Sequence, residues 1–194
     1  MQEILAHPQD TLEEEVCALA DYMGAQAGLP TEVMGVTGSL LTSSHNPAFS
    51  DIDLLIYGGD NAARLKERLG IDGTAEFRHA SAEEVAGWCE RVVRNHGLSM
   101  EEAAYLARRR WNYGYFGQRY VSIHAIRTDD EITEEYGSRI YGGQGEARVR
   151  AVVSDASESL FLPAIYKVEG VQVVDGNPAA VGIREIISYE GLYN

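Results

Sequence analysis

The chain has 194 residues, 45% of them hydrophobic, which is enough for one large domain or for a domain with a small appendage. Its net charge of −14 argues against broad, nonspecific binding of nucleic acid. There is no run of about eighteen apolar residues and no basic, apolar leader. Cys17 and Cys89 form neither a disulfide framework nor a zinc pattern. We therefore expect a cytoplasmic protein that does not engage a membrane.

The first part of the chain predicts a helix followed by a short apolar strand. Residues 10–27 carry apolar side chains at helical spacing, with Asp10 or Thr11 as the N-cap and Gly28 after the last turn. Residues 32–37 are mostly apolar and predict a strand. The Gly-Ser pair and the polar residues that follow predict a turn and then a loop.

Two acidic residues, Asp51 and Asp53, open a second strand that we expect at residues 51–57. Side chains alternate along a strand, which places both carboxylates on one face, about 7 Å apart at a rise of roughly 3.3 Å per residue. Such a pair can share divalent cations. The turn at Gly38 and Ser39 offers backbone N–H groups and a hydroxyl to a phosphate, and the glycine has no side chain to block it. The alternative is a surface loop that ends in an acidic edge strand.

The middle of the chain predicts helices and then a β-hairpin. Two segments with the pattern Ser-x-Glu-Glu, beginning at Ser81 and Ser99, are capping boxes that mark helix starts. Gly117 and Gln118 separate two arms rich in aromatic and β-branched residues and predict the hairpin turn. The expected elements are a helix over residues 61–69 capped by Asp60, a short strand within 71–78, helices over 81–95 and 99–109, and hairpin arms over 111–116 and 119–126.

Arginines form a basic island in this acidic chain. No acidic residue lies between Glu102 and Asp129, and five arginines fall in that interval. Guanidinium groups bind phosphate oxygens through paired hydrogen bonds, so we expect these arginines to bind a triphosphate. The alternative is that the arginine triplet lies in solvent and complements the dipole at the end of a helix. The basic island comprises Arg108, Arg109, Arg110, Arg119 and Arg127.

After Asp130 the composition changes, which predicts a main domain over residues 1–130 and a second, smaller part. Residues 131–145 are acidic and rich in glycine, as is typical of a linker. Residues 146–194 contain short β-branched segments and predict a small β module. Its tyrosines and basic residues favour binding of single-stranded nucleic acid, whereas its interspersed acids favour a packing or dimerisation surface. The strands are expected at 148–153, 160–168, 171–174 and 181–189, and the tyrosines are Tyr166, Tyr189 and Tyr193.

The Gly-Ser pair, a spacer of eleven residues and Asp-Ile-Asp, set between apolar strands, resemble the motif of the DNA polymerase β-like nucleotidyltransferase superfamily. More narrowly, the chain resembles the archaeal predicted nucleotidyltransferases. The resemblance covers residues 33–57 and implies an α+β fold, a mixed sheet flanked by helices, to which the β module is appended. It also implies that Asp51 and Asp53 hold Mg²⁺ or Mn²⁺, and that Gly38 and Ser39 hold the phosphates of an NTP.

In this superfamily a third carboxylate, on a neighbouring strand, helps to bind a metal. The arm at residues 119–126 is expected beside the strand at 51–57, and its polar face offers Ser122 and His124 in place of an acid. This departure from the motif puts full catalytic competence in question. His124 is either a softer metal ligand or general base near neutral pH, or an ordinary histidine of the fold.

The sequence therefore supports two hypotheses of different classes. The first is a metal-dependent nucleotidyltransferase that transfers a nucleoside monophosphate from an NTP to an unknown acceptor, with RNA and protein as candidates. The second is a weak or inactive protein of the same fold that binds a nucleotide or RNA. The intact Gly-Ser and Asp-x-Asp segments favour the enzyme, and the absent third acid favours the binding protein. The β module and the chain length disfavour a minimal antitoxin-type nucleotidyltransferase.

Overall fold

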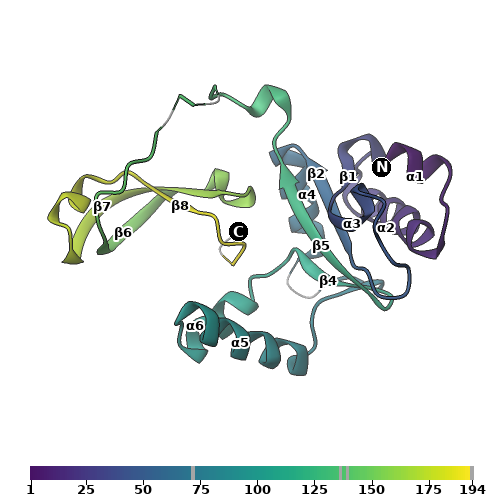
Figure 1. Cartoon of the computed structure of the whole chain (residues 1–194), viewed down its shortest axis with the longest axis horizontal. Coiled ribbons are helices and arrows are strands. Elements are labelled where there is room, and N and C mark those ends of the chain that lie inside the picture. Colours follow the sequence, from purple (N-terminus) through teal and green to yellow (C-terminus); the bar gives the residue numbers. More distant parts are fainter. Residues whose placement is uncertain (71–72, 136, 139, 193–194) are drawn as a thin grey trace. The chain divides into compact units, whose positions relative to one another are not determined.

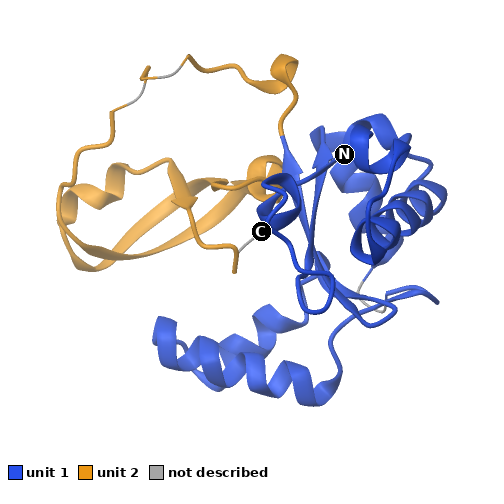
Figure 2. Ribbon diagram, turned by 45° about the vertical axis from the view of Figure 1, so that its right-hand side comes forward, with its two compact units in different colours: residues 1–126 blue, residues 127–194 orange. Residues whose placement is uncertain are grey.

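The computed structural model describes residues 1–70, 73–135, 137–138 and 140–192. The chain forms two compact units, residues 1–126 and 127–194, coloured blue and orange in Figure 2. The first unit contains a five-stranded mixed sheet with helices, and the second contains a three-stranded antiparallel sheet. The expected α+β class, with a separate β sheet at the C-terminal side, is confirmed. Among the described residues, no helix combines the length and apolar character that a membrane span requires.

The strands of the first unit are β1 (Met34–Val36), β2 (Ile52–Tyr57), β3 (Phe77–Arg78), β4 (Tyr113–Phe116) and β5 (Arg119–Ile126). They lie in the order β1-β2-β5-β4-β3, so strands that are distant in sequence become neighbours (Figure 1). The pair β2 and β5 is parallel, and the other neighbouring pairs are antiparallel. The expected hairpin of β4 and β5 is confirmed, and Gly117 at φ +59° permits its tight turn. The expected neighbourhood of β2 and β5 is confirmed as well.

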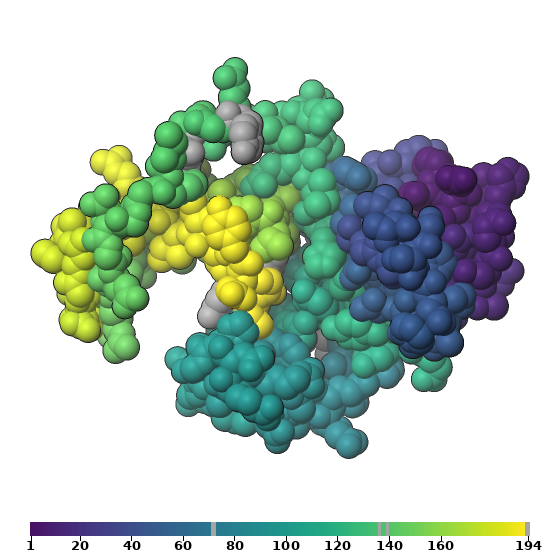
Figure 3. Space-filling view, viewed as in Figure 1, coloured from purple at the N-terminus to yellow at the C-terminus, as the bar shows by residue number. Residues whose placement is uncertain are grey.

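The α-helices are α1 (Gln2–Ala6), α2 (Thr11–Ala27), α3 (Gly38–Leu41), α4 (Gly59–Leu69), α5 (Ala82–His96) and α6 (Met100–Ala107). Short 3-10 helices are η1 (Thr31–Val33), η2 (Asp129–Glu131), η3 (Ser157–Leu160) and η4 (Pro178–Gly182). The expected N-caps of α2, α5 and α6 are confirmed, and those of α5 and α6 are complete capping boxes. The α5–α6 pair forms a lobe at the lower edge of Figure 3, in teal.

One face of the five-stranded sheet forms the core of the first unit. Helices α2 and α4 pack together, and α4 packs on β2 and β5. Ile52, Leu54 and Ile56 of β2 are fully buried, and their cross-strand partners on β5, which include Val121 and Ile123, are buried with them. Alternation then leaves the second face of β2 and β5 for polar side chains.

Three expected boundaries in the first unit are wrong in detail. Helix α4 has Gly58 and not Asp60 as its N-cap, because Gly58 at φ +95° turns the chain directly out of β2. The Gly-Ser pair begins the short helix α3 rather than a loop turn. Helix α6 ends at Ala107, two residues before the expected limit of 109. The short strand expected within 71–78 is confirmed as β3, and residues 71 and 72 lie outside the described residues.

The second unit is built on β6 (Ala147–Asp155), β7 (Ala164–Gly176) and β8 (Glu185–Ser188), in that order across the sheet. The two strands expected on either side of Gly170 form the single strand β7. Gly170, at φ +61°, is accommodated in a β-bulge where the pairing with β6 shifts register, and so the glycine does not end the strand. The last strand is shorter than expected, since residues 178–182 form η4. Tyr193 lies outside the described residues.

A cluster of contacts holds the loop between α3 and β2. Arg119 of β5 bonds Glu15 of α2, with 2.6 Å between Nε and Oε2. The same guanidinium donates to the backbone oxygens of Pro47, at 2.8 Å, and Ser50, at 2.7 Å. Arg119 therefore ties the hairpin, the first long helix and the loop that leads into the acidic strand.

His45 attaches the same loop to the start of α2. Its Nε2 lies 2.8 Å from Asp10 Oδ2, while the other carboxylate oxygen of Asp10 accepts the backbone N–H groups of Leu12 and Glu13. The hydrogen bond from Glu13 N–H and the contact with His45 lower the pKa of Asp10. One carboxylate thus caps the helix and positions the loop.

We expect Arg119→Gln to lower the free energy of unfolding of the first unit by about 2 kcal/mol, because hydrogen bonds to charged groups contribute about 1.5–3 kcal/mol. Both tryptophans of the chain, Trp88 and Trp111, lie in this unit, so urea unfolding followed by tryptophan fluorescence measures the change. Arg91→Gln, at an exposed position of α5, is the control and should change stability by less than about 0.5 kcal/mol. Identical unfolding midpoints for the two variants would show that the contacts of Arg119 do not stabilise the first unit.

Candidate functional site

A hydrogen-bonded chain of three side chains crosses strands β2 and β5. The parallel register places Asp53 opposite Ser122, and Leu55 opposite His124. The Ser122 hydroxyl donates to Asp53 Oδ1, and Ser122 Oγ lies 2.9 Å from His124 Nε2. Because the hydroxyl proton is directed to the carboxylate, His124 Nε2 must be the donor, and Nδ1 keeps the lone pair. A carboxylate is thereby linked to an imidazole that has a basic nitrogen.

Burial sets the protonation of His124. Its removal from water lowers the pKa of the imidazole, and the charge of Asp53 opposes that shift. The ring is therefore neutral at pH 7, and its Nδ1 can accept a proton or ligate a metal. The imidazole meets the Tyr113 ring edge to face, with 6.4 Å between centroids and 90° between planes.

The two acidic residues differ in exposure. Asp51 lies one residue before β2 and is exposed, whereas Asp53 is half-buried. Alternation continued back from β2 places both carboxylates on the face that carries Ser122 and His124. Carboxylate oxygens suit Mg²⁺ or Mn²⁺, so the residues present fit such a cation. Within the described part of the chain, no three His, Cys, Asp or Glu side chains gather as a metal cluster, and the metal-binding role of the pair stays a prediction.

Gly38, the first residue of α3, lies against the acidic strand. Its φ of +62° favours glycine, and a Cβ at this position would overlap the Asp53 carboxylate. The backbone N–H of Thr37 donates to Asp53 O at 3.0 Å, which ties the start of α3 to β2. The Gly38-Ser39 pair and the acidic strand are thus adjacent in space. Their contact with phosphate stays a prediction.

The structure does not gather the basic island at one point. Arg119 is occupied by Glu15 and by two backbone oxygens of the loop. Arg127 belongs to the second unit, where it pairs with Glu158 and lies 4.1 Å over the Phe161 ring. A phosphate at either arginine would have to displace a carboxylate that is already in place.

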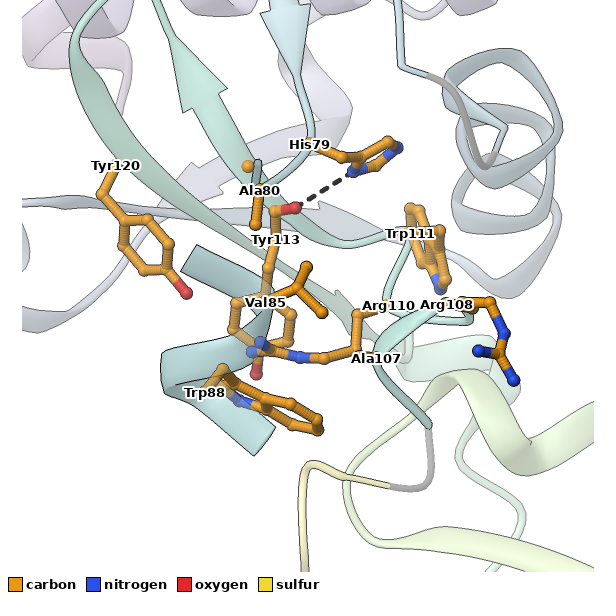
Figure 4. Close-up of a pocket in the computed structure, with 11 residues that line it drawn as sticks. His79, Ala80, Val85, Trp88, Ala107, Arg108, Arg110, Trp111, Tyr113 and Tyr120 are labelled. Carbon is orange, nitrogen blue, oxygen red and sulfur yellow. Dashed lines mark hydrogen bonds between the residues drawn. The ribbon is translucent and has the colours of Figure 1, made fainter. Parts of the chain in front are cut away.

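The arginine triplet after α6 also separates. Arg108 is exposed and, in Figure 4, points away from Arg110. Arg109 bonds the hydroxyl of a tyrosine one helical turn earlier. Arg110 lies over two aromatic rings, with its Cζ 4.5 Å from the centroid of Trp88 and 3.8 Å from that of Tyr113. Of the three, Arg110 alone is enclosed by aromatic side chains.

A cavity of about 210 Å³ opens between the α5–α6 pair and the β3–β4–β5 part of the sheet (Figure 4). Sequence reasoning missed this cavity, because it grouped the arginines as one phosphate-binding island. An arginine followed directly by aromatic residues, Arg-Trp-Asn-Tyr from position 110, was the available signal. The cavity is lined by, among others, Val85, Trp88, Arg110, Trp111, Tyr113 and Tyr120.

Tyr120 lines this cavity and lies two residues before Ser122 on β5. Side chains two residues apart on a strand share a face, and Ser122 is paired with Asp53 of β2. The cavity wall at Tyr120 and the acidic residues therefore lie on the same face of the sheet. Burial raises the pKa of the Tyr120 hydroxyl, while the charge of Arg110 and its hydrogen bond to Tyr120 oppose that shift.

The chain is 29% identical over 185 residues to an uncharacterized protein of the archaeon Methanocaldococcus jannaschii. The match covers 93% of this chain and 51% of the relative, so the chain spans about half the length of the curated relative it matches. No family model and no solved structure matches the chain. The name of the relative states no activity, so the function must be argued from the residues of this chain.

Gly38→Ala and Gly97→Ala form a matched pair, because both glycines have a positive φ, +62° and +66°, but only Gly38 faces Asp53. At Gly97, with open space around it, we expect a loss of about 1 kcal/mol from the left-handed backbone alone. At Gly38 we expect about twice that loss, because the Asp53 carboxylate must also move. Urea unfolding measures both, and equal losses would show that the contact with Asp53 is unimportant.

Proposed function

We propose that the first unit is a metal-dependent nucleotidyltransferase, which transfers a nucleoside monophosphate from an NTP to an acceptor hydroxyl. The observation that carries this proposal is the meeting of three elements at Asp53: the first turn of α3, strand β2 and the parallel strand β5. A Gly-Ser pair packed against an acidic strand is the arrangement that the resemblance leads us to expect. That RNA or a protein is the acceptor, served by residues 146–194, stays a prediction.

In this reaction the acceptor oxygen forms a bond to the α-phosphorus, the bond to the β-phosphate oxygen breaks, and pyrophosphate leaves. Asp51 and Asp53 would hold the divalent cations, which would supply positive charge to the attacking and leaving oxygens. The backbone N–H groups at Gly38 and Ser39 face the outgoing phosphates. The Nδ1 atom of His124 accepts the proton that the acceptor hydroxyl loses.

A binding protein without turnover is the second candidate. Strand β5 contains no acidic residue, and the position opposite Asp53 is Ser122. The serine directs its only proton to the carboxylate and so cannot replace the third acidic ligand of the superfamily. Pyrophosphate release from each of the four NTPs, with Mg²⁺ and with Mn²⁺, separates turnover from binding.

Asp51→Asn and Asp53→Asn should each weaken the binding of a Mg²⁺–NTP complex at least about tenfold, because an amide cannot match the charge of a carboxylate ligand. Isothermal calorimetry on the full chain measures the affinity, and circular dichroism checks the fold. Asp60→Asn, at an exposed position of α4, is the control and should bind as the wild type does. Unchanged affinity in both test variants would place the metal site elsewhere.

His124→Ala should lower the rate of pyrophosphate release about a hundredfold, within the usual contribution of a general base, and leave the protein folded. His124→Asp should keep or raise the Mg²⁺-dependent rate, because it supplies a third carboxylate one hydroxyl away from Asp53. His96→Ala, at the exposed end of α5, controls for loss of an imidazole. Wild-type turnover in His124→Ala would make His124 a structural residue.

A further inference from the structure

Lys66 of α4 is a cation without an acidic partner. Its side chain is half-buried, and its ammonium nitrogen lies 5.8 Å from the centroid of the Trp111 ring. Among the described residues, none forms a hydrogen bond or an ion pair with this ammonium. The face of an indole attracts a cation but does not neutralise its charge, and a cation removed from water is stabilised by pairing with an anion. The surroundings of Lys66 therefore lack an anion.

A second cation lies close to Lys66. Burial lowers the pKa of Lys66, and the charge of Arg109 lowers it further, while no described aspartate or glutamate opposes the shift. Arg109 follows α6, so two elements that are distant in sequence bring their positive charges together. Two like charges repel each other, and an anion bound between them would turn this repulsion into attraction.

The guanidinium of Arg109 keeps donors for a ligand. One of its terminal nitrogens donates to the hydroxyl of Tyr105, and its Cζ lies 5.1 Å from the centroid of that ring. A guanidinium has several N–H donors, so the others stay available. The Tyr105 oxygen accepts from Arg109 and keeps its own proton to donate. Both side chains are exposed, so a ligand can reach them from solvent.

The composition of the chain makes unpaired neighbouring cations unusual. Acidic residues number 30 and lysines and arginines 16, so a carboxylate should be easy for any cation to find. Arg119 is paired with Glu15, and Lys167, the other lysine of the chain, is paired with Asp155 at 2.9 Å. Lys66 lacks such a carboxylate although it is half-buried, which indicates that its anion comes from outside the chain.

We propose that Lys66, Arg109 and Tyr105 bind a phosphate group. A phosphate group carries negative charge on several acceptor oxygens, which the ammonium, the guanidinium and the phenol can share. Arginine in particular suits phosphate, because its planar fork donates to two oxygens at once. The group belongs to a free phosphate compound or to the backbone of a nucleic acid, since both present the same oxygens.

This phosphate site is separate from the proposed transferase site. Helix α4 packs on β2 and β5, whose apolar residues lie on the buried face of the sheet. Asp53 alternates with those residues and so lies on the opposite face. A phosphate at Lys66 is therefore not one of the phosphates expected at Gly38, and the inference does not rest on the proposed function.

The two lysines of the chain provide an internal comparison for the test. Reductive methylation of the full chain with formaldehyde, followed by mass spectrometry of its peptides, measures the reactivity of Lys66 and Lys167 separately. Saturating inorganic phosphate, compared with chloride at the same ionic strength, should slow the methylation of Lys66 about tenfold, because an adjacent anion raises the pKa of an ammonium by about one unit and only the free amine reacts. Lys167, already paired with Asp155, should react at an unchanged rate. Equal effects on both lysines, or no effect on Lys66, would overturn the proposal.

Variants locate the binding at the proposed residues. Arg109→Gln should weaken the protection of Lys66 by phosphate at least about tenfold, because it removes a charge-assisted donor, and Tyr105→Phe should weaken the protection as well. Arg68→Gln, at an exposed position in the last turn of α4, is the control and should leave the protection unchanged. If Arg109→Gln fails to fold, the comparison of the two lysines in the wild type still decides the question. Full protection in folded Arg109→Gln would refute the role of the arginine.

A short single-stranded RNA distinguishes the two sources of the phosphate group. If the RNA protects Lys66 at lower concentrations than inorganic phosphate does, the group belongs to a nucleic-acid backbone. If only inorganic phosphate protects, the ligand is a small phosphate compound, and if neither protects, the site is refuted. Protection by phosphate without metal should be unchanged in Asp53→Asn, so this site and the transferase assignment stand or fail independently.

Discussion

The parallel pairing of β2 with β5 is the constraint on which the candidate site depends. It sets Asp53 against Ser122 and brings His124 within one hydroxyl of the carboxylate. The register is held by burial on the opposite face, where Leu54 and Ile123 are paired in the core. A slip of one residue would turn the polar side chains of β5 into that core and its apolar side chains toward solvent, so the packing energy of the fold also positions the site.

Features that depend on a few consecutive residues could be predicted from the sequence. The alternation of apolar and acidic residues around Asp53 predicted which face of β2 carries the carboxylate. The Ser-x-Glu-Glu segments predicted where α5 and α6 begin and which residues cap them. The hairpin of β4 and β5 followed from its short turn and its flanking residues. Each of these signals is local, because the atoms that cause it lie within one turn or one strand.

The pairing of β2 with β5 could be expected from the family resemblance, but contacts between individual side chains that are distant in sequence could not be predicted. The bond from Arg119 to Glu15 joins residues 104 positions apart, and no property of either residue in isolation indicates the other. The same holds for Arg110 and Trp88, which meet only after α5 and α6 have folded back along the sheet. The five arginines were close in sequence and were therefore grouped, but the fold sends them to different partners. Charge density along a chain does not determine charge density in space.

The distance in sequence between Glu15 and Arg119 also has a consequence for synthesis. A nascent chain that has emerged only as far as α6 already contains Glu15, Asp51 and Asp53, but β5 and its arginine are not yet available to close the loop. Closing a contact of such high sequence separation is slow compared with forming a helix or a hairpin. The acidic pair therefore reaches its final setting only after the hairpin is made, so a partly synthesised chain does not contain the completed site.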